Sequence, residues 1–190
     1  DSGRPTINSL MPFAYQIADL GRQWSVLVHS RMLTYAHILD LDTKFRALLS
    51  SLPIFLRPDP TLEQLPEVRQ EQAQRPYLAM HRLIVFEAVN QRLLVLHRDD
   101  MCRGHHDEKF AYSTRVAVDA ARTILSCRQQ IDNVHPAVQK HAAFRHHLFQ
   151  AAIVLSIHLL ELSHKAQGSS QVAHQLRDDI ALIMNYLYGS

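Results

Sequence analysis

Residues 83–96 read LIVFEAVNQRLLVL, and this run decides the fold. Only Glu87 and the stretch 90–92 interrupt its apolar side chains, so a helix built from it is apolar around most of its circumference, which is typical of a helix enclosed by others. Pro76 lies just upstream, where a first-turn proline is tolerated because its missing N–H would be unpaired there anyway. The sequence therefore predicts a central, enclosed helix from Pro76 to about His97.

The composition of the whole chain favours the same fold class. The 190 residues are 47% hydrophobic, enough to bury a core. The five glycines and eight prolines lie mostly at segment ends, whereas leucine, alanine, arginine and glutamine fill the interiors. Such interiors suit helices and lack the β-branched residues of sheets. We expect an all-α protein.

Upstream of the central helix, apolar residues recur at helical spacing from Thr6 to Leu52 and fit two helices. Gly21 and the stretch 40–43 are the plausible interruptions between them. Pro53 should close the second helix, because the residue before a proline resists the helical conformation. Residues 58–75, rich in proline, glutamine and charge, are expected to form a connecting loop.

Downstream, segment boundaries follow from polar stretches and from glycine. We expect a polar hinge at 98–107, a helix at 108–131, a boundary at 132–136, a helix at 137–165, a stop and N-cap at 168–170, and a last helix ending at Tyr188. About six antiparallel helices in one domain spanning 1–190 result, arranged as a bundle or a stacked helical array.

Motifs for catalysis are missing, and we expect no enzyme and no metal held by this chain. None of the thirteen histidines has another three or four residues away, as ligands on one helical face would require. The pairs Asp99-Asp100 and Asp178-Asp179 resemble the magnesium motifs of helical isoprenoid enzymes, but Arg103 stands where a further acid is needed. An isoprenoid-type enzyme is the third-ranked alternative, and it predicts stabilisation by magnesium.

Charge and cysteine content narrow the partners and the compartment. Twenty Lys and Arg residues nearly balance eighteen Asp and Glu residues, so the chain has no broad field to hold DNA. Two cysteines are too few for a disulfide framework, and a reducing compartment is expected. The longest apolar run, at 151–157, is too short for a membrane span.

Several ordered motifs resemble the "middle homology" regulatory region of fungal zinc-cluster transcription factors. They are the helix-to-Leu-Pro stretch at 36–56, Arg75-Pro76-Tyr77, the helix ending Leu94-Val95-Leu96-His97-Arg98, Tyr112-Ser113 with the helix 117–125, and the apolar helix at 149–155. The resemblance covers about residues 33–165. It departs at Asp99, where the family usually has proline, and the chain lacks the six-cysteine zinc cluster.

The resemblance implies a non-catalytic helical regulatory domain, part of a longer nuclear protein. Zinc and DNA binding are then expected only in a missing N-terminal segment. A small hydrophobic effector, other transcription proteins or a second copy of the chain are the implied partners. Candidate ligand-binding residues are Trp24, Tyr77, Phe86, His97, Arg98 and Tyr112. For the aromatic residues the alternative is core packing, and for His97 and Arg98 it is capping of a helix C-terminus.

A second hypothesis stays open beside the regulatory one. A helical scaffold for protein–protein interaction, without small-molecule input, would use residues 58–75 or an exposed apolar face. An effector-binding domain should be stabilised by hydrophobic metabolites, and a scaffold should not.

Overall fold

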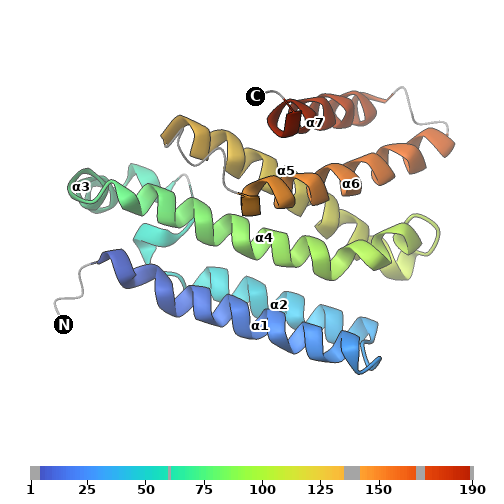
Figure 1. The fold of residues 1–190 in the computed structure, drawn as a ribbon, viewed down its shortest axis with the longest axis horizontal. Helices are drawn as coiled ribbons and strands as arrows, with labels where there is room; N and C mark the ends of the chain where they lie inside the picture. The colour runs from blue at the N-terminus through green and yellow to red at the C-terminus, as the bar shows by residue number, and fades with distance from the viewer. Residues whose placement is uncertain (1–4, 60, 135–141, 166–169, 189–190) are drawn as a thin grey trace. The chain divides into compact units, whose positions relative to one another are not determined.

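The chain is all-α, as predicted. The computed structural model describes residues 5–59, 61–134, 142–165 and 170–188, and the described residues contain no β-strand. Seven α-helices lie within them: α1 (Met11–His29), α2 (Tyr35–Ser51), α3 (Pro66–Gln74), α4 (Tyr77–Gly104), α5 (Ala111–Val134), α6 (Ala142–His164) and α7 (Gln171–Tyr188). Short 3-10 turns occupy Ile7–Leu10, Ile54–Leu56, Leu62–Gln64 and Glu108–Phe110. Figure 1 shows their order along the chain.

The chain divides into two compact units, which we describe separately. The first comprises Asp1–Val89, with α1, α2, α3 and the first half of α4, and the second comprises Asn90–Ser190, with the rest of α4 and α5 to α7. In the first unit α1 and α2 form a helical hairpin, and in the second α6 packs against both α5 and α7. The apolar run of α4 is covered as the sequence predicted, because no residue from Tyr77 to His97 is exposed.

The break between α1 and α2 lies at 30–34, not at Gly21 or at 40–43 as predicted. Arg31 adopts a left-handed conformation with φ of 58°. The Met32 N–H donates to the Leu27 carbonyl over 3.0 Å, and the Arg31 N–H donates to the Val28 carbonyl over 3.0 Å. This is the Schellman arrangement that ends helices, and glycine usually occupies the left-handed position. No glycine stands at residues 30–34 to mark the end of α1 in the sequence.

Asp42 explains why the acidic stretch at 40–43 does not interrupt α2. Its carboxylate is buried and accepts two hydrogen bonds from Arg46, one turn later, from Nε at 2.8 Å and Nη2 at 3.1 Å. Thr34 caps the N-terminus of the helix by accepting from the His37 N–H at 3.4 Å. The predicted end before Pro53 is confirmed, since α2 stops at Ser51.

Residues 58–75 are not simply a loop, and this prediction is corrected by α3. Pro66 occupies its first turn, and Val68 is its only buried side chain. A helix with so few apolar residues has no hydrophobic periodicity to read. The segment is attached to α4 by an ion pair between Glu63 and the buried Arg82.

The polar hinge predicted at 98–107 is largely helical, because α4 continues to Gly104. Asp100 and Arg103 pair over 2.8 Å on one side of this extension, while Met101 on another side is fully buried. The polar residues therefore lie along a helix surface, and the turn shrinks to 105–107. Gly104 ends the helix where a side chain would not fit, since a Cβ there would lie 2.4 Å from the Phe110 carbonyl oxygen.

The remaining helices follow the predicted boundaries closely where they are described. After the turn at 108–110, α5 runs to Val134, within the boundary predicted at 132–136. Residues 135–141, the predicted start of α6, and residues 166–169 lie outside the described residues. The Ser170 hydroxyl accepts from the Ala173 N–H over 3.3 Å, so the predicted N-cap of α7 is confirmed. Cys127 is buried on α5.

Candidate functional site

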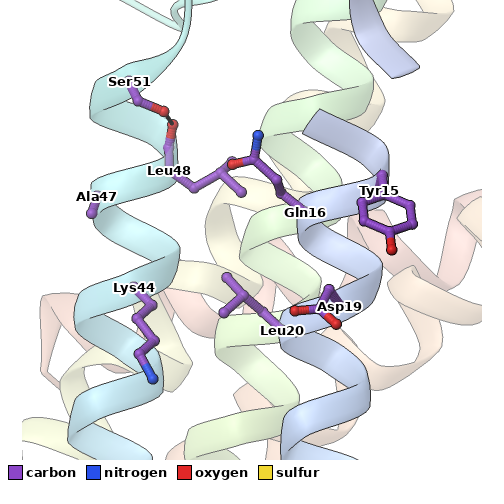
Figure 2. A pocket seen from close by; sticks show the side chains of 8 residues that line it. All are labelled: Tyr15, Gln16, Asp19, Leu20, Lys44, Ala47, Leu48 and Ser51. Atoms are coloured by element: carbon purple, nitrogen blue, oxygen red, sulfur yellow. Dashed lines mark hydrogen bonds between the residues drawn. The ribbon is translucent and has the colours of Figure 1, made fainter. Parts of the chain in front are cut away.

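A hollow of about 420 Å³ lies between α1 and α2 in the first unit (Figure 2). Its volume falls in the range of about 300–1,000 Å³ that is typical of small-molecule pockets. The lining side chains come from two turns of each helix: Tyr15, Gln16, Asp19 and Leu20 from α1, and Lys44, Ala47, Leu48 and Ser51 from α2. We call this hollow the α1–α2 groove.

The floor of the groove is apolar and its rim is polar. Leu20 projects from α1 toward α2, and Leu48 projects from α2 toward α1 (Figure 2). Leu48 is buried and Leu20 is half-buried, while Ala47 is exposed beside them. A small exposed side chain at Ala47 leaves room along the α2 wall. The groove therefore offers an apolar surface that water reaches, a combination that favours binding of apolar groups.

The charged side chains of the groove are each held by a neighbour on the same helix. Asp19 accepts from the Arg22 Nη2 at 2.7 Å and from the Gln23 Nε2 at 2.9 Å. These hydrogen bonds, that of Arg22 foremost, lower the pKa of Asp19, which is therefore ionised at neutral pH. The Lys44 ammonium lies 2.7 Å from the Asp40 carboxylate.

The neutral polar side chains of the groove are free to bind. Neither the Tyr15 hydroxyl nor the Gln16 amide forms a hydrogen bond with any described residue. The Ser51 hydroxyl donates to the Leu48 carbonyl over 2.8 Å, which leaves its oxygen lone pairs available. Figure 2 shows Gln16 and Ser51 toward one end of the groove and Asp19 and Lys44 toward the other.

A second, smaller hollow of about 300 Å³ continues along the same two helices. It shares Lys44 with the groove and is otherwise lined by Arg22, Gln23, Val26, Leu27, Asp40 and Leu41. The two hollows thus lie along the same pair of helices and meet at Lys44, which pairs with Asp40.

The six residues predicted to bind a ligand are divided between the two units, with Trp24, Tyr77 and Phe86 in the first and His97, Arg98 and Tyr112 in the second. Trp24 is half-buried on α1 but lines neither hollow between α1 and α2. Tyr77 donates from its hydroxyl to the Pro5 carbonyl over 3.4 Å and packs on His81, and Phe86 is half-buried on α4. Arg98 is exposed beside Asp99. Their role in ligand binding stays a prediction.

His97 and Tyr112 are the two predicted residues that the second unit brings together. Their rings meet edge to face with centroids 5.6 Å apart, and the His97 Nδ1 lies 2.9 Å from the Ser113 hydroxyl oxygen. His97 is fully buried. The alternative that it caps a helix end is wrong, because α4 continues for seven residues beyond it to Gly104. Its contacts join α4 to the start of α5.

Histidines far apart in the sequence meet in the second unit, a contact that spacing along one helix could not predict. The His158 Nδ1 of α6 lies 3.2 Å from the His105 Nε2 of the turn after α4. Burial, helped by the charges of His105, Arg122 and Lys165, lowers the pKa of His158 to about 4. His158 also lines a hollow of about 330 Å³ with residues of α5.

Across residues 5–59, 61–134, 142–165 and 170–188, no three His, Cys, Asp or Glu side chains are placed to share a metal ion. Within those ranges, no helix combines the length and apolar character needed to cross a bilayer.

Sequence comparison places the chain near two fungal proteins. It is 26% identical over 147 residues to the probable transcription factor lepB of Aspergillus flavus, an alignment that covers 75% of this chain and 25% of lepB. It is 29% identical over 125 residues to the agnestins biosynthesis cluster transcription factor AgnL11 of Paecilomyces divaricatus, covering 65% of this chain and 17% of AgnL11. The chain thus spans a quarter or less of these relatives. No protein-family model and no solved structure matches it.

The groove residues were not singled out from the sequence, and the sequence marks them only weakly. Tyr15, Gln16 and Asp19 lie on one face of α1, as Lys44, Ala47 and Ser51 do on α2, but each set alone is an ordinary solvated helix face. The site arises from the pairing of the two faces. That pairing requires the break at 30–34, which the sequence did not mark.

Proposed function

We propose that this chain is a non-catalytic regulatory region of a fungal zinc-cluster transcription factor and that a small effector bound in the α1–α2 groove sets its output. The carrying observation is the similarity to two fungal transcription factors over most of this chain but over a quarter or less of theirs. The ordered motifs between residues 33 and 165 support the zinc-cluster assignment. On this proposal the protein acts in the nucleus.

DNA binding is assigned to another part of the protein. The net charge of +2 gives the chain no broad electrostatic attraction for a polyanion. The zinc cluster of such a factor would likewise lie outside this chain. What these 190 residues contribute is helical structure with an accessible groove in the first unit, and they would act on transcription through the partners or conformations that the effector favours.

A transcription assay tests the regulatory proposal. The 190-residue chain is fused to an unrelated DNA-binding domain in a yeast reporter strain. Reporter output is measured with and without an organic-solvent extract of Aspergillus flavus, the source of the relative lepB. The fusion protein should give a reporter output different from that of the DNA-binding domain alone. Addition of the extract should raise or lower the output of the fusion protein. Ala47→Trp fills the groove and should abolish the response to extract, whereas Ala143→Trp, at an exposed alanine of α6, should keep it. A fusion with the output of the DNA-binding domain alone, in both conditions, would refute the proposal.

A protein–protein scaffold is the second candidate, and α6 supplies the observation in its favour. Phe149, Ile153 and Leu160 are 51%, 44% and 60% exposed and recur on one face of this helix. Exposed apolar faces of this kind mark protein interaction sites. Under this alternative, substitution of the three residues by serine would abolish reporter output, while Ala47→Trp would have no effect.

A further inference from the structure

We infer that the α1–α2 groove selects an uncharged ligand, with an apolar body and a hydroxyl or carbonyl group bound at the Gln16–Ser51 end. The inference rests on the proposed function, because it names the chemical class of the effector for the same site. It follows from which polar groups of the groove are paired and which are free.

The charges of the groove cancel locally. Asp19 with Arg22, and Lys44 with Asp40, form two pairs at 2.7 Å, so this end carries no unpaired cation or anion among the groups that line it. A charged ligand would lose hydration in the groove and gain no free counter-charge in return. A charged ligand could pair with Asp19 or Lys44 only by displacing the partner that each already has. Such an exchange replaces one exposed ion pair by another, and exposed ion pairs contribute little, so the ligand would gain no net affinity.

The free polar groups are neutral and can both donate and accept. The Gln16 amide offers two donors and one acceptor, and the Tyr15 hydroxyl offers one donor and acceptor sites. Neither is committed to a described residue. Gln16 projects into the space between the helices, close to Leu48, while Tyr15 lies at the outer rim (Figure 2). A ligand hydroxyl or carbonyl placed there is matched without displacing an existing hydrogen bond.

The apolar floor of the groove indicates what kind of ligand body it accommodates. Leu20 and Leu48 face each other across the groove, with Ala47 on the α2 wall. These side chains supply apolar contact for the ligand body and no directional group. Apolar burial there gives affinity, and the single amide end gives orientation, which is the usual division of labour in small-molecule pockets.

Three probes with one ring system test the ligand class. Binding of a naphthol, a naphthoate and a naphthylmethylammonium ion to the 190-residue chain is measured by ligand-observed NMR titration at neutral pH. We expect the naphthol to bind about tenfold more tightly than either ion, a difference of about 1.4 kcal/mol. Gln16→Leu should reduce this preference to less than threefold, because it removes the amide and keeps the apolar volume.

Matched variants separate failure of this inference from failure of the proposed function. Ala47→Trp should weaken all three probes at least tenfold, and Ala143→Trp should leave them unchanged. If an ionic probe binds as tightly as the naphthol and Ala47→Trp still blocks it, the ligand class is wrong and the groove remains the site. If no probe binds, or if Ala47→Trp has no effect, the inference is overturned, and the reporter assay alone then decides the regulatory function.

Discussion

Replacing Gly104 with alanine should destabilise the second unit, although alanine is the better helix former. A Cβ built at this position lies 2.2 Å from the Thr114 Oγ1 and 2.4 Å from the Phe110 carbonyl oxygen, where ordinary contacts begin at 3.4 Å. The Thr114 side chain can rotate away, but it would give up its hydrogen bond to the Met101 carbonyl. The Phe110 carbonyl belongs to the backbone, so the end of α4 and the start of α5 must separate.

The two opposing contributions can be compared in magnitude. Overpacking a well-packed position costs about 1–3 kcal/mol, and a lost hydrogen bond adds about 0.5–1.5 kcal/mol. Alanine recovers at most about 1 kcal/mol through helix propensity, and less at a helix end. We therefore expect Gly104→Ala to lower the free energy of unfolding by about 2 kcal/mol.

Urea denaturation followed by far-ultraviolet circular dichroism measures this change, provided that the slope with urea is the same in both proteins. Gly21→Ala is the matched control, because Gly21 lies in the interior of α1 and the same substitution there should stabilise by about 0.5–1 kcal/mol. A Gly104→Ala protein as stable as the parent would show that α4 and α5 do not approach so closely, and the packing argument would fail.

Two further predictions concern charged and titrating groups. Because the pKa of His158 is lowered to about 4 in the folded chain, the unfolded chain binds more protons between pH 6.5 and 4. Stability should fall as pH falls through this window, and His158→Phe should flatten the urea midpoint against pH; an unchanged pH profile would contradict this. Asp42→Asn should lower the free energy of unfolding by about 1–2 kcal/mol by weakening the paired hydrogen bonds from Arg46, whereas Asp40→Asn, at an exposed pair, should change it by less than about 0.5 kcal/mol; equal effects would refute the role of burial.

The fold class could be predicted because it depends on features repeated along the chain. Residues 83–96 are apolar around a helix, and in the structure no residue from Tyr77 to His97 is exposed. Pro53 and Ser170 marked helix boundaries correctly, because each acts through its own backbone or side-chain chemistry.

Boundaries set by tertiary contacts could not be predicted. Arg31 takes the left-handed conformation that usually belongs to glycine. The polar extension of α4 past His97 reads as a hinge, and its helical state depends on burial of Met101 and on the fit of Gly104 against Phe110. At the α4 extension the deciding contacts are tertiary, whereas at Arg31 the stop is a local Schellman arrangement that lacks the glycine by which such stops are usually recognised.

Two of the predicted ligand residues show that a motif alone does not tell what a side chain contacts. His97 and Tyr112 were singled out by motif, and the structure gives them a packing role between α4 and α5. A buried histidine bonded to a serine is difficult to tell from a ligand contact by sequence, since both require the same residue types in the same order. The groove residues, by contrast, belong to no motif.

The α1–α2 hairpin has the properties that a responsive element needs. Ile17 is the only buried residue of α1, so this helix is held by fewer apolar contacts than the helices of the second unit. Weakly held elements open at low free energy, and ligand-binding segments are drawn from them. An effector that contacts Leu20 on α1 and Leu48 on α2 together would stabilise the paired hairpin by its differential affinity for that state, at 100 times its Kd by about 2.7 kcal/mol. A gain of this size is comparable to the cost of a single core substitution, so under the proposed function an effector of this kind would favour the paired state of the hairpin.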